Sequence, residues 1–305
     1  MIKKLKNTIE GSLIKWGFLE KKDDIIPYAF LAPALIILGG ILFFPLVYSF
    51  VLSFFNWNMT QSGGAEFVFL DNFIKLFGNG AFWHSVRLQV LFVAISVFLE
   101  LLIGLGVAML LNHNFAGEHV VRALLLLPVF ILPVVSGLTF RFMYDPQYGA
   151  INWLIGLFGF NPVPFLSKST FAFVAIIIQD VWRMWPFMFM ILYASLSSLP
   201  ESPYEAAAIS GATKWQVFRH VTLPMLKPSI VIAVILRIVN ALKAFSEIYV
   251  MTNGGPGDAT SIMSIFIYKN AFDFYEMGYS AAASYVLVAI ALAFSIYLVK
   301  TQFEF

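Results

Sequence analysis

Apolar residues fill six long segments of the chain, and polar residues gather in the stretches between them. Each segment is long enough for a helix to cross the hydrocarbon core of a bilayer, which takes about 20 residues. The pattern predicts an all-α, polytopic bundle with membrane spans at 27–51, 86–111, 122–143, 171–198, 229–250 and 279–300. A weaker apolar run near 262–275 is interrupted by Lys269 and Asp273, so we expect it to lie outside the hydrocarbon.

Basic residues in the flanks of these spans predict their orientation. Lysines crowd the N-terminal tail, 1–26, and further basic residues follow in the loop at 199–228, whereas the opposite flanks carry Lys75, Lys168 and Lys269. Loops rich in lysine and arginine stay in the cytoplasm. We therefore expect a cytoplasmic tail, a single transmembrane domain over 27–305, and both termini and the 199–228 loop on the cytoplasmic side.

Composition supports a membrane protein and removes several other classes. Hydrophobic residues make up 60% of the 305 residues and charged residues 12%, against about 25% charged in soluble domains. The net charge of +2 predicts no nucleic-acid partner. Cysteine is absent and the four histidines share no metal-ligand spacing, so we expect no metal site. There is no G-x-x-x-x-G-K-[ST] motif, so the chain should bind no ATP and should not itself be an enzyme.

Ionisable residues inside the fourth and fifth spans are the candidates for a solute pathway, because such residues are costly in a membrane. Asp180 and Arg183 can pair on one helical face, and Lys243 and Glu247 can neutralise each other. They either join helices or line a site for a neutral, hydroxyl-rich solute. The candidate pathway residues are Asp180, Arg183, Trp185, Asn240, Lys243 and Glu247.

Three residues of the second span are expected to have structural roles. Glu100 stands alone between leucines, so it should face the bundle or a partner helix. Gly104 and Gly106 are small residues that allow a neighbouring helix to approach closely.

The stretch SPYEAAAISGATKWQVFRHVTLP, from 202 to 224, predicts two short capped helices. Ser202 and Glu205 fit a capping box, and Gly211 fits the left-handed end of that helix. Thr213 opens a second box with Gln216, and the second helix should end before Pro224. By local physics the stretch is a linker, a DNA-binding helix-turn-helix or a docking element for another protein.

The same stretch resembles the signature loop of ABC-transporter importer permeases. The matching residues are Glu205, Ala206, Ala207, Gly211, Leu223 and Pro224, with Val221 in place of the family's isoleucine. Further along, MTNGGPGDAT is similar to the tail of sugar-importer permeases of the maltose, multiple-sugar and glycerol-phosphate type. In that family, Gly254, Gly255 and Pro256 would lie near the external gate or the bound solute-binding protein.

The resemblance implies a multi-pass permease subunit in a prokaryotic cell membrane. It would import a sugar delivered by an extracytoplasmic solute-binding protein, together with a second homologous permease and two cytoplasmic ATPase subunits. ATP and magnesium would bind to those ATPase subunits, and the 199–228 loop would be the coupling helix. Two rivals remain: an ion-coupled secondary transporter using Asp180, Glu247 or Glu100, and a membrane scaffold that recruits a soluble protein.

Overall fold

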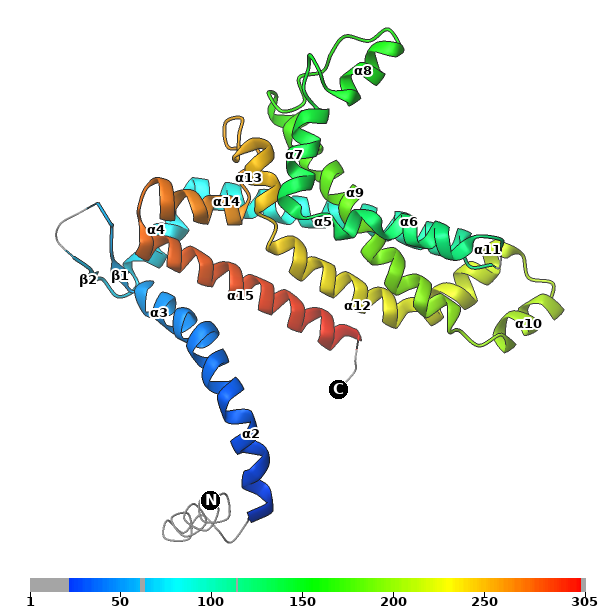
Figure 1. The fold of residues 1–305 in the computed structure, drawn as a ribbon, viewed down its shortest axis with the longest axis horizontal. Coiled ribbons are helices and arrows are strands. Elements are labelled where there is room, and N and C mark those ends of the chain that lie inside the picture. The colour runs from blue at the N-terminus through cyan, green and yellow to red at the C-terminus, as the bar shows by residue number, and fades with distance from the viewer. Residues whose placement is uncertain (1–21, 61–63, 114, 303–305) are drawn as a thin grey trace, which may run out of the picture.

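The computed structural model describes residues 22–60, 64–113 and 115–302, and almost all of them are helical (Figure 1). Five segments in this part of the chain are long and apolar enough to cross a membrane, and one sharply bent pair of helices would make a sixth. Their helices are α2 (Lys22–Leu38) with η1 (Gly39–Phe43) and α3 (Phe44–Leu52), α5 (Gly80–Leu110), α6 (Glu118–Phe130) with α7 (Pro133–Met143), α9 (Ser169–Ser197), α12 (Leu223–Leu242) and α15 (Met277–Gln302).

Shorter elements connect these spans. Two strands of two residues each, β1 (Phe55–Asn56) and β2 (Glu66–Phe67), pair antiparallel before α4 (Asp71–Gly78). The remaining elements are α8 (Ala150–Leu157), α10 (Ser202–Ile209), α11 (Lys214–Val217), η2 (Phe218–Thr222), α13 (Ser246–Thr252), α14 (Met263–Tyr268) and η3 (Lys269–Asp273). The weak apolar run at 262–275 is thus helical but too short to be a span.

Two of the predicted spans are broken. The third, predicted as one helix over 122–143, bends by 92° between α6 and α7. Pro128 lies inside α6 and Pro133 opens α7, so two prolines fall within one expected helix. The fifth, predicted to continue to 250, stops at Leu242 and resumes as α13 after an irregular turn. Both breaks lie beside each other, because α7 packs against α13 (Figure 1).

The core lies between α5, α9 and α12. Buried side chains from these helices and from α13 form one apolar cluster that includes Phe92, Ile176, Met188, Ile238 and Ile248. Apolar burial gives little drive for association inside a membrane, so close packing has to hold these helices together.

Close packing is visible at Gly104. A β-carbon at this position would lie 2.8 Å from the backbone nitrogen of Phe189 and 2.7 Å from the β-carbon of Met188, which leaves no room for a side chain. The expectation for Gly104 is therefore confirmed. For Gly106, which is exposed, no atom of the described residues lies within 4 Å of such a β-carbon, so within this part of the chain the expectation is wrong.

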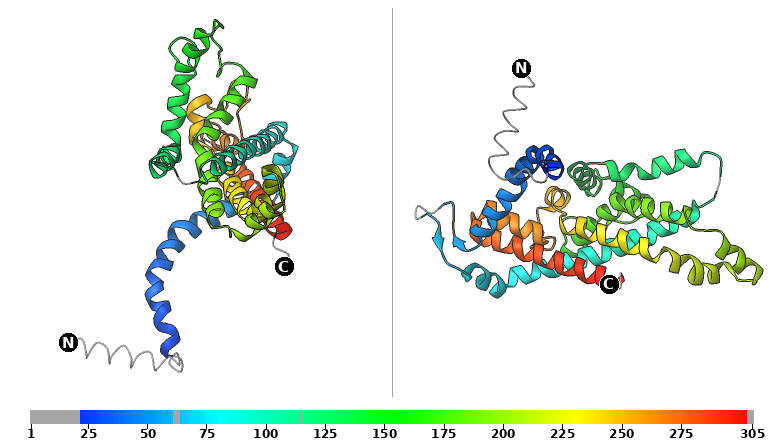
Figure 2. Two further views of the ribbon diagram at one scale, coloured as in Figure 1. Left: turned by 90° about the vertical axis from the view of Figure 1, so that its right-hand side faces the viewer. Right: turned by 90° about the horizontal axis from the view of Figure 1, so that it is seen from below.

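The first span stands apart from this core. None of the most apolar window of Phe30–Leu52 is buried, and α2 projects away from the other helices in both Figures 1 and 2. The later part of the span, α3, packs beside α15, where the rings of Phe50 and Tyr285 lie 5.0 Å apart, whereas the apolar surface of α2 is open to lipid or to another chain.

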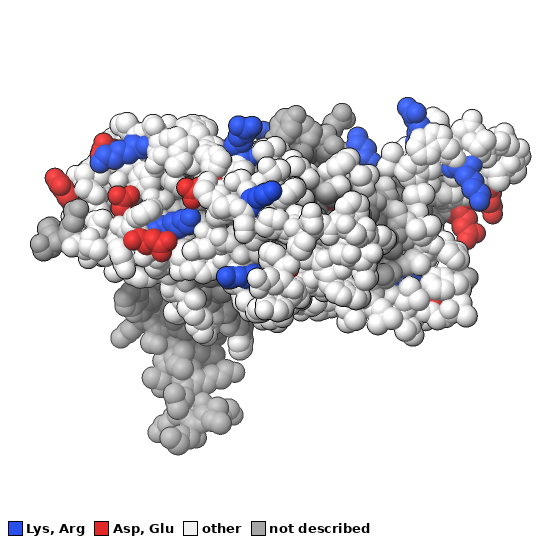
Figure 3. Space-filling model, turned by 90° about the horizontal axis from the view of Figure 1, so that it is seen from above, with Lys and Arg blue, Asp and Glu red and all other residues white. Residues whose placement is uncertain are grey.

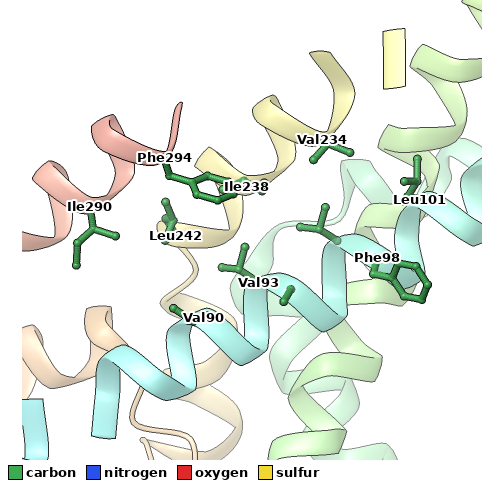
Figure 4. Close-up of a pocket in the computed structure, with 11 residues that line it drawn as sticks. Val90, Val93, Phe98, Leu101, Val234, Ile238, Leu242, Ile290 and Phe294 are labelled. Atoms are coloured by element: carbon green, nitrogen blue, oxygen red, sulfur yellow. The ribbon is translucent and has the colours of Figure 1, made fainter. Parts of the chain in front are cut away.

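The outer surface has the charge distribution expected of a membrane protein. On the face shown in Figure 3, acidic side chains gather near the two ends of the molecule, and most of the surface between them is uncharged. One groove of about 380 Å³ between α5, α12 and α15 has a wholly apolar lining (Figure 4), formed by side chains such as Val93, Phe98, Ile238, Leu242 and Phe294. Its side chains offer a polar solute no hydrogen bond, so this groove does not suit the transport of such a solute.

Candidate functional site

A fully buried ion cluster joins the three core helices. Arg237 of α12 donates two hydrogen bonds to Glu100 of α5, from Nε to Oε2 at 2.6 Å and from Nη2 to Oε1 at 2.9 Å. The same Nη2 donates to Oδ2 of Asp180 in α9. Each of these side chains is at most 1% exposed. Glu100 faces the bundle interior as expected, and its guanidinium partner keeps its charge from being isolated there.

A second pair extends the cluster toward α13. Arg183 Nη2 donates to Glu247 Oε1 at 3.2 Å and lies 3.8 Å from Asp180 Oδ1. The sequence offered Lys243 as the partner of Glu247, but the structure pairs Glu247 with Arg183 from another helix. This pair connects α13 to α9. Because Arg237 of α12 also bonds to α9, the two helices on either side of the break in the fifth span are both held to α9 by ion pairs.

A cavity of about 220 Å³ opens beside this second pair. Its wall includes the turn between α12 and α13 at Lys243–Phe245, and Pro133 at the break between α6 and α7. Irregular backbone at membrane depth is tolerated where it is buried in protein or lines a cavity, because its N–H and C=O groups must find partners. The two broken spans therefore line a polar cavity within the bundle core.

The structure brings most of the predicted pathway residues to this cavity. Its lining includes Asp180, Arg183, Asn240, Lys243 and Glu247, together with Arg237 and Ser246. Trp185 is half-buried elsewhere, with its ring 6.2 Å from that of Phe189, and does not contribute to the wall. The pathway role of all these residues stays a prediction.

Charges in and around the cavity balance. The lining carries two acidic side chains, Asp180 and Glu247, and three basic ones, Arg183, Arg237 and Lys243. Glu100 does not line the cavity but bonds to Arg237, and it makes the acidic and basic side chains equal in number. Asn240 Nδ2 donates to the carbonyl of Leu236 at 2.9 Å, which leaves its own carbonyl available. The one basic side chain in excess in the lining is thus offset by Glu100 behind it, and the cavity presents several hydrogen-bonding groups of both kinds to a polar solute.

Sequence reasoning missed Arg237. It lies within the apolar run of the fifth span, three residues before Asn240 and so on the same helical face. An arginine so far from a span end has no short route to water, and Glu100 in the second span required a basic partner. Together, these two facts could have predicted the pairing of Arg237 with Glu100.

The predicted coupling loop is a pair of helices with a sharp bend between them. At the end of α10, Ala212 N–H bonds to Ala207 O and Gly211 N–H to Ala208 O, both at 3.0 Å, and Gly211 has a positive φ of 68°. These two bonds make a Schellman motif and confirm the helix end predicted from Gly211. Tyr204 Oη donates to Thr222 Oγ1 at 3.2 Å, which ties α10 to the following helix.

One of the two predicted capping boxes exists. Thr213 accepts from Gln216 N–H at 3.4 Å, and the Gln216 side chain accepts from Thr213 N–H at 2.8 Å. The first box is wrong, because Ser202 already lies inside α10 and the residue before it, Glu201, makes no side-chain cap. Glu201 has helical backbone angles, so its side chain is not in the geometry that capping requires.

The predicted end of the second helix before Pro224 is also wrong. The helix continues through α11, η2 and α12, and Leu223 N–H bonds to Phe218 O five residues earlier. Such a π turn widens the helix immediately before Pro224. The widening relieves the clash between a proline ring and the carbonyl of the preceding turn, and that clash is what the prediction relied on.

The loop leaves its conspicuous side chains uncovered. Glu205 is exposed and has no ion-pair partner within the described ranges. Ile209 is 89% exposed and Trp215 65% exposed. Two large exposed apolar side chains and a carboxylate on one short loop favour a docking element over a linker, and docking stays a prediction.

The segment around Gly254, which the sequence predicts to be external, is tightly folded. Asn253, Gly254, Gly257 and Asp258 all have positive φ, and a β-carbon on Gly254 would lie 2.9 Å from Ile265 Cγ2. Thr260 Oγ1 donates to Gly255 O at 2.9 Å. The predicted gate residues Gly254, Gly255 and Pro256 thus belong to a compact turn seated on α14. Their contact with a gate or a binding protein stays a prediction.

Known proteins share this sequence and fold. The family described as "Binding-protein-dependent transport system inner membrane component" matches residues 100–304. A probable ABC transporter permease protein of Sinorhizobium fredii is 37% identical over 90% of this chain and 89% of its own length. The trehalose/maltose transport system permease protein MalF of Thermococcus litoralis is 35% identical, over 92% of this chain and 95% of its own.

A third relative and a solved structure agree with this. The sulfoquinovosyl glycerol transport system permease protein SmoG of Agrobacterium fabrum is 34% identical over 93% of this chain and 92% of its own. A chain of a bacterial alginate ABC transporter, solved in complex with an alginate pentasaccharide-bound periplasmic protein, superimposes with a TM-score of 0.78 at 22% identity, over 92% of this chain and 94% of that chain. This chain belongs to the family of inner membrane components of binding-protein-dependent transport systems.

Proposed function

We propose that this chain is one permease subunit of an ATP-driven importer whose solute is a neutral saccharide. A second, homologous permease would complete the pathway, and two cytoplasmic ATPase subunits carrying ATP and magnesium would drive it. An extracytoplasmic binding protein would deliver the sugar. Relatives named for trehalose and maltose and for sulfoquinovosyl glycerol support a saccharide solute.

The polar cavity at the two broken spans, whose charges balance when Glu100 behind it is counted, is the observation that carries this proposal. Asp180, Arg183 and Glu247 hold one another in place, so their remaining lone pairs and N–H groups are oriented before a solute arrives. Asn240 and Ser246 add neutral groups to the same wall. A sugar hydroxyl both donates and accepts hydrogen bonds, so it can use either kind of group.

The exposed side chains of the coupling loop support the ATP-driven mechanism. Glu205, Ile209 and Trp215 would be covered by an ATPase subunit, and the bend at Gly211 fixes the angle between α10 and α11. Closure of the ATPases would move this rigid pair of helices, and α12 continues directly from it toward the cavity. One continuous helical segment, from α11 through η2 to α12, would therefore transmit movement of the loop to the cavity.

Reconstitution tests the proposal against its rivals. The chain is placed in liposomes alone or with its partner permease, ATPases and binding protein, and uptake of radiolabelled maltose and trehalose is measured. We expect ATP-dependent uptake by the complete assembly and none by the chain alone. Uptake by the chain alone under an ion gradient would show a secondary transporter instead. Absence of uptake by the complete assembly, with ATPase activity intact, would contradict a maltose- or trehalose-type solute.

A further inference from the structure

A second polar cavity lies at the end of the molecule opposite the coupling loop. It has a volume of about 580 Å³ and is enclosed by the start of α5, the turn at Gly257–Ser261, and α14 with η3. In Figure 1 these elements are at the left, and α10 and α11 are at the far right. No residue lines both this cavity and the one at the broken spans. Its size is within the range of small-molecule sites, about 300–1,000 Å³.

Buried polar groups in its wall lack partners. Ser85 is 1% exposed and Ser261 4% exposed, and neither hydroxyl has a hydrogen-bond partner in the described part of the chain. Asn270, 9% exposed, donates from Nδ2 to Phe266 O at 2.7 Å, and its carbonyl oxygen has no partner there either. None of these oxygen atoms is fully enclosed by protein, and all three residues line the cavity, so their hydrogen-bonding capacity is available to a ligand there.

The charged groups of the cavity are already matched. Lys269 Nζ lies 3.2 Å from Asp258 Oδ1, and His84 Nε2 is 3.2 Å from the Asp258 carbonyl. An anion would have to displace Asp258 from Lys269, and a cation would have to displace Lys269 from Asp258. A neutral ligand with several hydroxyl groups needs neither change.

Aromatic rings complete the lining. Phe274, 61% exposed, stands at the cavity, and Phe266 is buried in its wall. An apolar ring face beside a few fixed hydrogen-bonding groups is the usual make-up of a site for a ligand with both kinds of surface. A sugar ring has such surfaces, with hydroxyls at its edge and C–H groups on its faces.

Gly254 holds one wall in place. With φ at 82°, its backbone lies so close to α14 and η3 that a β-carbon would be 3.0 Å from Lys269 Nζ and 2.9 Å from Ile265 Cγ2. The compact turn at 253–258 is therefore packed against the lysine of the Asp258–Lys269 pair. The cavity is connected by contact to the segment predicted to form the external gate.

We propose that this cavity is a second saccharide site, which holds a neutral sugar unit at the outer end of the permease through Ser85, Ser261 and Asn270, with Phe274 against the ring. The choice of a saccharide rests on the proposed function, whereas the cavity and its unpaired hydroxyls do not depend on it.

The absence of cysteine makes a direct test possible. Ser261→Cys places a single thiol in the wall, His84→Cys places one on the exposed rim, and Ser167→Cys gives a matched thiol in the exposed α8–α9 connection. Each variant is incorporated into the assembled transporter in nanodiscs. The rate of alkylation by N-ethylmaleimide is measured with increasing maltose or trehalose. Only the empty site reacts, so sugar at about ten times its Kd should slow alkylation about tenfold.

The expected result is slower alkylation at positions 261 and 84 and an unchanged rate at 167. If the thiol at 261 proves unreactive, the rim position carries the test. Unchanged rates at both cavity positions, with a sugar that the same assembly transports, would overturn the second site and leave the proposed function standing. Protection by a sugar that is not taken up would support the site and contradict the transport function.

Two other occupants give their own signatures, and either would overturn the proposal. If the sugar-free binding protein alone slows alkylation at 84 and 261, the cavity is a docking pocket for that protein. If both thiols react in the isolated chain but not in the assembly without sugar, the partner permease covers the cavity.

Discussion

Arg237 provides the basic partner for two buried carboxylates at the centre of the bundle. Its guanidinium bonds to Glu100 and Asp180 at once, so it neutralises one carboxylate and partly screens the other. Asp180 in turn faces Arg183 at 3.8 Å. Acidic and basic groups thus alternate along the contacts from α5 through α12 and α9 to α13, and each group orients the next one.

Replacement of Arg237 should therefore be severe. Arg237→Met leaves Glu100 without its partner in a dry interior, and the loss of one member of a buried pair costs about 3–5 kcal/mol. We expect a marked fall in the thermal unfolding midpoint of the detergent-solubilised protein. Arg87→Met is the control, because Arg87 is exposed on the same helix as Glu100. Equal stability of the two variants would show that the cluster contributes little to folding.

At the scale of elements, the cavity is formed by the breaks in two spans and by the contact between α7 and α13. The third and fifth spans both break where α7 meets α13, and Gly137 permits this contact, since a β-carbon there would lie 2.8 Å from Glu247 O. Glu247 is thus positioned by its backbone as well as by Arg183. The cavity exists because neither span is continuous at this depth.

The contact between α5 and α9 can be tested with two glycines of one helix. Alanine favours a helix by about 1 kcal/mol over glycine, so Gly106→Ala at the exposed position should be neutral or slightly stabilising. Gly104→Ala should destabilise despite the same gain, because its β-carbon collides with the Phe189 backbone. Unfolding midpoints of both variants decide this. A stabilised Gly104→Ala would mean that α5 and α9 separate without cost.

Across the whole molecule, sequence patterns predicted the number of spans, the helix–Gly–helix loop and most of the charged residues that line the central cavity. Periodicity and hydropathy locate apolar segments well, because length alone sets what crosses a bilayer. They did not predict the breaks at 131–132 and 243–245, nor the pairing of Arg183 with Glu247. Those features depend on which helices become neighbours, and one helix pattern contains no information on its partner. The π turn before Pro224 escaped prediction because proline was assumed to end a helix.

Coupling is a property of the whole assembly, and Glu205 provides its test. We expect Glu205→Ala to leave ATP hydrolysis by the reconstituted transporter in place while uptake falls about tenfold or more, equivalent to about 1.4 kcal/mol or more at the docked surface. Glu201→Ala is the matched control, since Glu201 is equally exposed at the start of α10 but outside the signature. Parallel measurements of ATPase rate and sugar uptake are needed. Coupled uptake at the normal rate in Glu205→Ala would contradict docking through this carboxylate.

The first span, whose α2 projects away from the other helices (Figure 1), has a consequence for how the protein is inserted into the membrane. No residue of its most apolar window is buried, and α3 contacts α15 through Tyr285 while α2 projects away, so in lipid this span depends chiefly on its own backbone hydrogen bonds. It can leave the insertion machinery as a finished helix before any of the charged spans is synthesised. The later spans, which carry Glu100, Asp180 and Arg237, cannot rest in lipid singly in the same way, because each brings an ion whose partner is on another helix. Biogenesis therefore divides into an early, independent anchor and a late group of helices that must enter the bilayer almost together.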